Sequence, residues 1–374
     1  MLSSFEIVNF RTFSHLRIER LGRVNLVVGK NNVGKTTLLE ALRFYAMGSA
    51  TALRECLVSR DELRRYGPGS AAQLDLRSLF HGRPHDRGKA SLGPLGQPDR
   101  NLAVRMADVE RVEYSDGRYH YEEYDDEGIA PEGEIFSGLV IERDGTRVLI
   151  SPEPTQRALG QGRYVGPAFV PARGVRESDL VQWWDEISLT GGDERVVEWL
   201  SLMAPVERVA AVEDPIRRDR RMFKVRLFGE KEPLPLKTLG EGPYRVFQVA
   251  TAIEYAFQAP RKREPDSLGD QDDESWGAKD LVLIDEIENG VHHTVHADLW
   301  KALLQAAREH NLQVFATTHS SDCLKGFEQA IAENEEADGL VIRLERVEGE
   351  AQTGAVIIDR DALPAVVRDS IEVR

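Results

Sequence analysis

The sequence is poor in the residues that mark secreted, membrane-embedded or generally DNA-coating proteins. Only two cysteines occur among 374 residues, Cys56 and Cys323, so neither a disulfide framework nor a zinc ribbon is available. No apolar run approaches the length of a membrane span, and no basic stretch followed by an apolar one opens the chain. Forty-eight basic residues against 63 acidic ones give a net charge of −15, which restricts any nucleic-acid contact to a local patch. These features predict a cytoplasmic protein.

What the sequence does contain is a complete phosphate-binding loop in the context that such a loop requires. Residues 24–28 are mostly apolar and predict a short buried strand, and residues 37–44 predict a helix with one apolar face. Between them, GKNNVGKT matches the pattern G-x-x-x-x-G-K-[ST]. The residues that we expect to contact the nucleotide are Gly29, Asn31, Asn32, Val33, Gly34, Lys35, Thr36 and Thr37.

The chemistry of this loop is that of a nucleoside triphosphate bound with Mg²⁺. Gly29 and Gly34 allow the backbone to turn its N–H groups toward a polyphosphate, and the start of the following helix faces the same anion. Lys35 is expected to neutralise the β- and γ-phosphates, and the Thr36 hydroxyl to ligate Mg²⁺. We therefore predict ATP and Mg²⁺ as cofactors.

Two further buried strands end in polar residues of the kind that hydrolyse phosphoanhydrides. The apolar residues 281–284 are followed by Asp285 and Glu286, and the strand expected at residues 312–318 is followed by His319. The carboxyl ends of parallel strands meet at one edge of a sheet, where ligands of α/β proteins bind. We expect Asp285 to hold Mg²⁺, Glu286 to polarise the attacking water and His319 to reach the γ-phosphate.

The rest of the chain carries weaker signals. Residues 5–18 predict two strands joined by a turn at Arg11 and Thr12, close enough to pair beside the phosphate-loop strand, and residues 101–151 alternate as β-strands. Residues 177–204 predict helices whose Trp183 and Trp184 belong to the core. Six basic side chains in residues 217–226 fit equally a solvated edge strand guarded by charge and a phosphate-contacting surface. Residues 261–279 are polar and acidic, which predicts a mobile loop.

These motifs together resemble the ATPase heads of the ABC superfamily, most of all the SMC-like and OLD-type bacterial ATPases. The resemblance covers residues 1–48 and 235–374 and rests on the stretches 29–37, 281–289 and 317–321. It implies that Asp285 is the magnesium ligand, Glu286 the catalytic glutamate and His319 the switch histidine.

The resemblance also implies a signature loop at residues 238–242, with Thr238, Gly240 and Glu241 meeting the nucleotide of a partner subunit. This loop departs from the family's serine-glycine-glycine pattern, because Thr238 replaces the serine and Leu239 the first glycine. The magnesium-sensing glutamine of the family has no evident counterpart, since residues 79–82 occupy its region without a glutamine.

From the resemblance we expect an α/β fold, an ABC-type P-loop head with a mixed central sheet and an N-terminal antiparallel β subdomain. Residues 1–48 and 235–374 would form the ATPase core, and residues 49–234 an inserted β and helical arm. No heptad pattern crosses the middle of the chain, so a coiled-coil clamp is not expected. The 55 residues after His319 are too few for a Toprim nuclease module, so Asp359 and Asp361 are expected in a closing strand and turn.

The resulting functional hypothesis is an ATPase that dimerises head to tail around ATP. By resemblance, such an ATPase would control a separately encoded effector, a nuclease or toxin-like protein in phage defence. The alternative is an ATP-dependent DNA clamp in repair or recombination, in which the stretch from Arg217 to Arg226 contacts the DNA directly. A third possibility is a phosphatase of free nucleotides.

Overall fold

The computed structural model places most of the chain. It describes residues 1–64, 73–84, 87–113, 119–124, 131, 133–151, 166–217, 220–258, 280–347 and 352–368. The polar stretch 261–279, expected to be a loop, lies outside the described residues.

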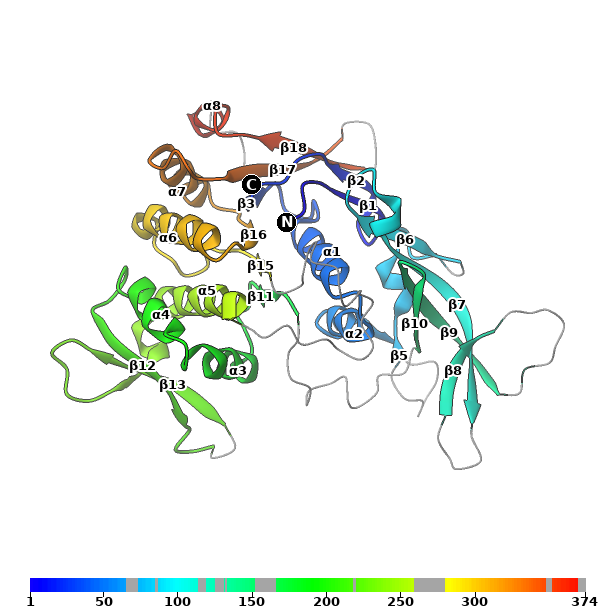
Figure 1. Ribbon diagram of the computed structural model, residues 1–374, viewed down its shortest axis with the longest axis horizontal. Helices are drawn as coiled ribbons and strands as arrows, with labels where there is room; N and C mark the ends of the chain where they lie inside the picture. The colour runs from blue at the N-terminus through cyan, green and yellow to red at the C-terminus, as the bar shows by residue number, and fades with distance from the viewer. Residues whose placement is uncertain are drawn as a thin grey trace.

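A six-stranded mixed sheet runs through the middle of the molecule (Figure 1). Its order is β11 (Ala168–Val170), β15 (Leu281–Ile284), β16 (Gln313–Thr317), β3 (Val24–Val28), β17 (Gly339–Arg346) and β18 (Thr353–Ile358). All neighbouring strands are parallel except β17 and β18, which are antiparallel. The predicted mixed sheet is confirmed, and Asp359 and Asp361 follow the closing strand as expected.

Helices cover both faces of this sheet because its inner strands are apolar on both sides. One face is covered by α5 (Glu241–Gln258), α6 (His296–Glu309) and α7 (Ser321–Ala332). α3 (Glu177–Ile187) and α4 (Gly192–Leu200) pack on α5, and α8 (Leu363–Arg368) lies beside α7. The other face packs against α1 (Lys35–Met47), and α2 (Ala50–Val58) packs beside α1. Val24 and Leu26 join the first core, whereas Val27 joins the second. Within the described ranges, no helix combines the length and the apolar character needed to cross a bilayer.

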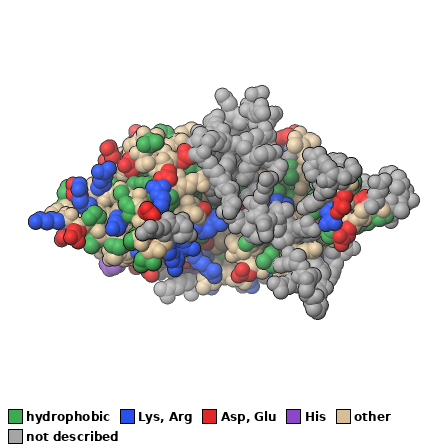
Figure 2. Space-filling model, turned by 90° about the horizontal axis from the view of Figure 1, so that it is seen from below, with side chains coloured by type: hydrophobic (Ala, Val, Ile, Leu, Met, Phe, Trp, Pro, Cys, Tyr) green, Lys and Arg blue, Asp and Glu red, His purple; other side chains and the backbone are tan. Residues whose placement is uncertain are grey.

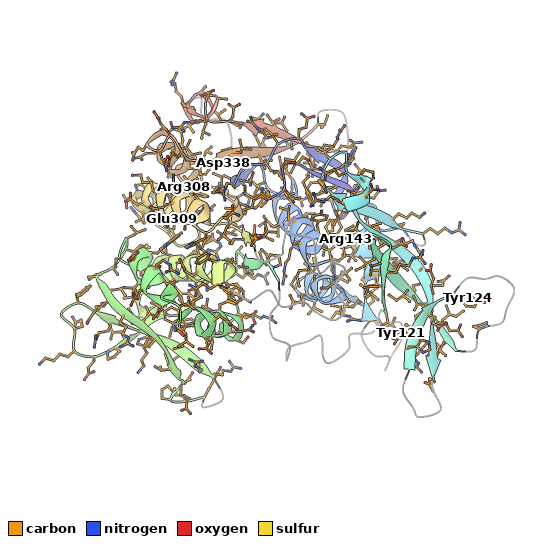
Figure 3. The ribbon with its side chains drawn as sticks, viewed as in Figure 1. Tyr121, Tyr124, Arg143, Arg308, Glu309 and Asp338 are labelled. Carbon is orange, nitrogen blue, oxygen red and sulfur yellow. The ribbon has the colours of Figure 1, made fainter. Side chains whose placement is uncertain are left out.

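A second, antiparallel sheet lies beyond α1 and α2, at the right of Figure 1. It consists of β1 (Phe5–Phe10), β2 (Phe13–Ile18), β6 (Lys89–Gly93), β7 (Leu102–Glu113), β8 (Tyr119–Glu123), β9 (Glu134–Arg143) and β10 (Thr146–Ile150). The guanidinium of Arg143 reaches from β9 to α1, where it donates to the Tyr45 carbonyl and lies 4.4 Å from the Tyr45 ring centroid (Figure 3). This sheet confirms the antiparallel β subdomain.

The expectation that the β1–β2 hairpin pairs beside the phosphate-loop strand is wrong. Both edges of β3 are occupied by β16 and β17, and β1 pairs instead with β6. Apolar side chains of the hairpin, Phe5, Ile7 and Phe13 among them, pack into the core that contains α1. The hairpin is therefore held by its apolar face, with no free strand edge of β3 for it to join.

A small three-stranded sheet is built from β12 (Val206–Glu213), β13 (Arg221–Leu227) and β14 (Leu234–Pro235). The interpretation of residues 217–226 as an edge strand is wrong, because β13 lies between the other two strands. Phe223 of β13 packs at ring-centroid distances of 5.7 Å from Trp184 and 4.8 Å from Phe247. Trp183 and Trp184 are 1% and 4% exposed, so both belong to the core as predicted.

The remaining described elements are short. They are β4 (Leu63–Arg64), β5 (Gln73–Leu74) and the 3-10 helices η1 (Leu76–Leu79), η2 (Pro98–Arg100), η4 (Leu236–Leu239) and η6 (His293–Val295). β11, from within the stretch 49–234, joins the central sheet, and the division of the chain at residues 48 and 235 stays a prediction.

The fully buried Gln313 at the start of β16 gives a test of this packing. Its side-chain amide donates to the carbonyls of Leu2 and Gly22 at 2.8 and 2.9 Å and accepts the Leu2 N–H at 2.9 Å. Gln313→Leu should lower the free energy of unfolding by about 1–3 kcal/mol, because it leaves buried backbone groups unpaired. The exposed Gln305→Leu should change it by less than about 0.5 kcal/mol. Equal urea midpoints for the two variants would contradict this role of Gln313.

Candidate active site

The phosphate loop connects β3 to α1, as the sequence predicts, and two glycines are required by close contacts. A Cβ atom at Gly29 would lie 2.3 Å from the Leu344 carbonyl oxygen, and one at Gly34 would lie 2.5 Å from the Phe13 ring. Both glycines have positive φ, +144° and +105°. The β1–β2 turn therefore packs directly on the loop, which sets the position of its N–H groups.

The eight predicted loop residues do not all present their side chains to a ligand. Asn31, Asn32 and Thr36 are exposed, whereas Val33 and Thr37 are buried in the protein, so those two can contribute only backbone groups. Asn32 adopts a left-handed conformation with φ +63°, which asparagine tolerates better than most residues. The nucleotide contacts of all eight stay predictions.

Lys35 is the cation of the site. Its side chain is 5% exposed, and Nζ donates to the carbonyls of Gly29 and Lys30 at 2.6 and 3.0 Å. Burial lowers the pKa of Lys35 below its usual value, and the carboxylates of Asp285, Glu286 and Glu288 act in the opposite direction. The ammonium group is thus held inside the loop close to three carboxylates, at a position where it could also bind a polyphosphate.

Asp285 joins the ends of three neighbouring strands. Its carboxylate accepts hydrogen bonds from Thr36 Oγ1 at 3.1 Å and from Thr317 Oγ1 at 2.7 Å. Thr36 follows β3, Asp285 follows β15 and Thr317 ends β16, so the parallel order of these strands brings the three together. The sequence did not single out Thr317, and the only signal for it was its place at the end of a predicted strand.

Glu286 and His319 meet at the same edge. His319 Nε2 lies 3.7 Å from Glu286 Oε1, and the other carboxylate oxygen of Glu286 accepts from Asn289 Nδ2 at 2.9 Å. Glu288 accepts the His319 N–H at 2.7 Å. Glu286 also has a left-handed backbone with φ +55°, a conformation that costs of order 1–3 kcal/mol for residues other than glycine. Such strain persists where surrounding contacts enforce it.

The oxygen atoms of Thr36 and Asp285 suit Mg²⁺. This ion prefers one or two protein oxygens together with phosphate oxygens and water. Among the described residues, no group of three or more His, Cys, Asp and Glu side chains is arranged to hold a metal alone. The donor set therefore fits a magnesium ion that arrives with a nucleotide.

The signature-like loop precedes α5 and is largely exposed. Thr238 Oγ1 donates to the Pro235 carbonyl at 2.7 Å, so its hydroxyl bonds within the loop. Gly240 has φ +102° with nothing within 4 Å of its Cβ position, and Glu241 is exposed. Gly242 packs against the segment that follows Glu286, because a Cβ atom there would lie 2.5 Å from the Gly290 carbonyl oxygen.

A cavity of about 480 Å³ adjoins the phosphate loop at Asn32. Sequence reasoning missed most of its lining, which includes Arg11, Thr12, Arg60, Glu62, Arg83 and Arg346, although it placed residues 79–82 near the site. Arg11 is buried and bonds to Glu40 and Glu62, both at 3.0 Å. These residues come from segments far apart in the chain, so no local pattern announced them.

The basic stretch 217–226 is partly neutralised. Arg221 pairs with Asp185 and Arg226 with Glu207, both at 2.6 Å, and Arg218 lies outside the described residues. The described surface in Figure 2 likewise intersperses basic with acidic and apolar side chains. The structure therefore does not present this stretch as an unbroken basic field.

Comparison with known proteins agrees with this geometry. The model of the AAA ATPase domain family matches residues 1–54 and 187–324, more than half of the chain. The chain belongs to this family. It is accordingly an ATP-hydrolysing enzyme, and its α/β fold is like that of Smc heads.

Curated relatives match over very different lengths. The chain is 21% identical over 376 residues to an ATP/GTP phosphatase of Helicobacter pylori (strain ATCC 700392 / 26695), covering 90% of each. It is 43% identical over 49 residues to the DNA replication and repair protein RecF of Clostridioides difficile (strain 630), covering 13% of each. An uncharacterized Methanocaldococcus jannaschii protein, MJECL10, is 42% identical over 45 residues, 12% of this chain and 20% of that protein. The match thus spans under a quarter of the length of the last two.

Solved structures of Smc heads share the fold. One, bound to the C-winged helix domain of ScpA, aligns with TM-score 0.51 at 13% identity and covers 96% of this chain and 98% of that one. Another has an extended coiled coil and is bound to the C-terminal domain of ScpA derived from Pyrococcus furiosus. It aligns with TM-score 0.50 at 11% identity and covers 98% of both chains. At such identities the likeness concerns the fold alone.

The Thr317 hydroxyl offers a test of the strand-end cluster. Thr317→Val removes the hydrogen bond that orients Asp285 and leaves the Glu286 N–H without its acceptor. Loss of a side chain that orients a metal ligand should raise the Mg²⁺ concentration for half-maximal ATPase activity by roughly 10–100-fold. Thr251→Val, which removes a buried hydroxyl bonded within α5, should not. An unchanged Mg²⁺ titration for Thr317→Val would contradict the role given to Thr317.

Proposed function

We propose that this ATPase closes as a head-to-tail homodimer around two ATP molecules and opens on hydrolysis. The observation that supports this most is that one chain carries both half of a nucleotide site and an exposed loop that could complete the site of a second molecule. The acids and cation around Asp285 form one half of a nucleotide site, and the exposed loop 238–242 is free to meet another molecule. ATP binding would then shift the equilibrium toward the closed dimer.

Each residue of the site has a defined part in this scheme. The phosphate loop would hold the polyphosphate through Gly29 to Thr37, and Thr36 and Asp285 would hold Mg²⁺, which neutralises phosphate charge. Glu286, fixed by Asn289, would take a proton from the attacking water, and His319 would contact the γ-phosphate. Thr238, Gly240 and Glu241 of one subunit would face the γ-phosphate bound by the other. The nucleoside would extend into the cavity beside Asn32.

ATP-driven closing and opening of a dimer is useful to the cell only if it changes the activity of something else. We infer that the dimer controls a separately encoded effector protein. The Smc heads named above are bound to domains of ScpA, which shows that this fold can present a surface to a partner protein. The resemblance to OLD-type ATPases points to a nuclease or toxin-like effector in cytoplasmic phage defence. This part rests on analogy of fold and motif.

A DNA clamp is the second candidate, and one observation favours it. On the outward face of the three-stranded sheet, Arg208 lies directly opposite Arg226, which also pairs with Glu207, and Lys224 is the next residue of β13 on that face. Like charges opposite each other are unfavourable in a sheet, and a bound phosphate backbone would relieve them. The short match to RecF, a replication and repair protein, agrees with this candidate.

Glu286→Gln should trap the closed dimer. The substitution keeps the shape of the side chain but removes the base, which lowers hydrolysis by roughly 10²–10⁴-fold. Light scattering with ATP and Mg²⁺ should show association of the variant at concentrations where the wild-type protein turns over. A variant that stays as dissociated as wild type would contradict the dimer. Salt-sensitive DNA retention by the trapped species would favour the clamp over the effector.

Composite sites can be tested by mixing two inactive variants. Gly240→Asp should place a carboxylate against the partner's γ-phosphate, where the like charges repel. Lys35→Ala removes the cation of the phosphate loop. A mixed dimer would contain one intact site, formed by the phosphate loop of the Gly240→Asp subunit and the loop 238–242 of the Lys35→Ala subunit. Mixing should therefore restore ATPase activity that neither variant has alone.

Gly96→Asp is the matched control for this experiment. Gly96 also has positive φ, +72°, and open space around its Cβ position, so it shares the strain and the charge but lies in another loop. This variant should keep its own activity. Full hydrolysis by a proven monomer would eliminate the composite site and favour a simple nucleotide phosphatase, as the name of the Helicobacter pylori relative suggests for that protein.

A further inference from the structure

Arg245 is a buried cation that lies directly beneath the catalytic acids. It sits in the second turn of α5 and is 4% exposed. Its guanidinium donates to the Pro171 carbonyl at 2.7 Å, to the Glu286 carbonyl at 3.1 Å and to the Asp285 carbonyl. All three acceptors are backbone groups at the carboxyl ends of β11 and β15.

A planar guanidinium is suited to this task. It presents several donors in a rigid fork, so one side chain can hold carbonyls from two strands at once. Burial lowers the pKa of Arg245 to about 10, while the carboxylates of Asp285, Glu288 and Glu286 act in the opposite direction. At neutral pH the group therefore stays charged, and its positive charge interacts with these three acids.

Three hydrogen bonds hold the left-handed backbone of Glu286. Thr317 Oγ1 accepts its N–H at 2.8 Å, and its carbonyl accepts from Arg245 and from the Asn289 N–H, both at 3.1 Å. Because φ +55° is unfavourable for glutamate, loss of the Arg245 contact would weaken this hold, let the peptide relax and move the carboxylate. A residue of α5 thus helps to set the direction in which Glu286 points.

The same helix begins at the signature-like loop. Gly240 ends the 3-10 helix η4, α5 starts at Glu241, and Arg245 follows one turn later. A second contact runs in parallel, since Gly242 packs against Gly290 in the segment after Glu286. A displacement of the loop would therefore reach the catalytic segment at two points within one subunit.

We infer that Arg245 is a positioning residue that holds Glu286 in its hydrolytic orientation and links it to the state of the loop 238–242. Its positioning role concerns the ATPase activity of the chain itself. The link to a partner's nucleotide rests on the proposed head-to-tail dimer.

The test compares Arg245→Gln and Arg245→Lys with the control Arg195→Gln. Arg195 also anchors α5, through hydrogen bonds to Glu254 at 2.6 and 2.9 Å, but near the far end of the helix from Arg245. Steady-state phosphate release gives kcat and KM, calorimetry gives ATP affinity, and thermal melting reports stability.

We expect Arg245→Gln to lower kcat by roughly 10²-fold, as small misplacements of catalytic groups do, while ATP affinity stays within about threefold of wild type. Arg195→Gln should keep the kcat of wild type even if its melting temperature falls as much as that of Arg245→Gln. Arg245→Lys retains the charge without the fork and should have a kcat between those of wild type and Arg245→Gln. If Arg245→Gln does not fold, Arg245→Lys decides, with a lowered kcat at unchanged ATP affinity as the expected result.

Two results would overturn the inference. One is a folded Arg245→Gln, or failing that Arg245→Lys, that hydrolyses ATP as fast as Arg195→Gln. The other is a loss that appears in ATP affinity and leaves kcat intact. The test of Arg245 does not depend on the proposed dimer, because Arg245→Gln should lower kcat even if the wild-type enzyme is a monomer. Conversely, dimer formation by Glu286→Gln with normal kcat for Arg245→Gln would refute the positioning role alone.

Discussion

The hydrogen bonds that Asp285 accepts from Thr36 and Thr317 are the contacts on which the site depends. They tie the ends of β3, β15 and β16 together, so that the phosphate loop, the acid pair and His319 share one edge of the sheet. A buried carboxylate is costly unless its oxygens are hydrogen-bonded, and here two threonine hydroxyls meet that requirement. The same oxygens are those that a magnesium ion would use, so the structural and chemical roles of Asp285 coincide.

The rest of the molecule keeps these strand ends in register. Apolar residues on both faces of β3, β15 and β16 pack into two separate cores, one formed with α3 to α7 and the other with α1, α2 and the antiparallel sheet. A one-residue slip of β15 would move its apolar side chains to the wrong faces and displace Asp285. Arg245, Thr317 and the Gly242–Gly290 contact then set the finer geometry around Glu286, including its unfavourable backbone conformation.

The charged side chains of the three-stranded sheet differ from those of the site in their exposure to solvent. Around Lys35 and Arg245 the charges are buried, and their partners are few and fixed. On β12 and β13 the ion pairs are exposed, so each contributes only about 0–1 kcal/mol to stability. Exchange of such weak pairs for other ionic contacts would therefore cost little.

The sequence alone determined the elements whose signal is local. The apolar strands with their polar ends, the glycine loop before α1 and the paired acids after β15 are each contained in fewer than a dozen consecutive residues, and they indicated both the fold and the ATPase site. Only the tertiary structure decided which strands became neighbours. β1 pairs with β6 because neither edge of β3 is free, and β13 is the middle strand of its sheet because β14 pairs with its second edge. Thr317, Arg245 and Arg11 acquire their roles from contacts with residues that are 29 to 74 positions away, among them Asp285, Pro171 and Glu40. Such contacts leave no periodic or motif signal, because they depend on how separate elements pack and not on what is adjacent in the chain.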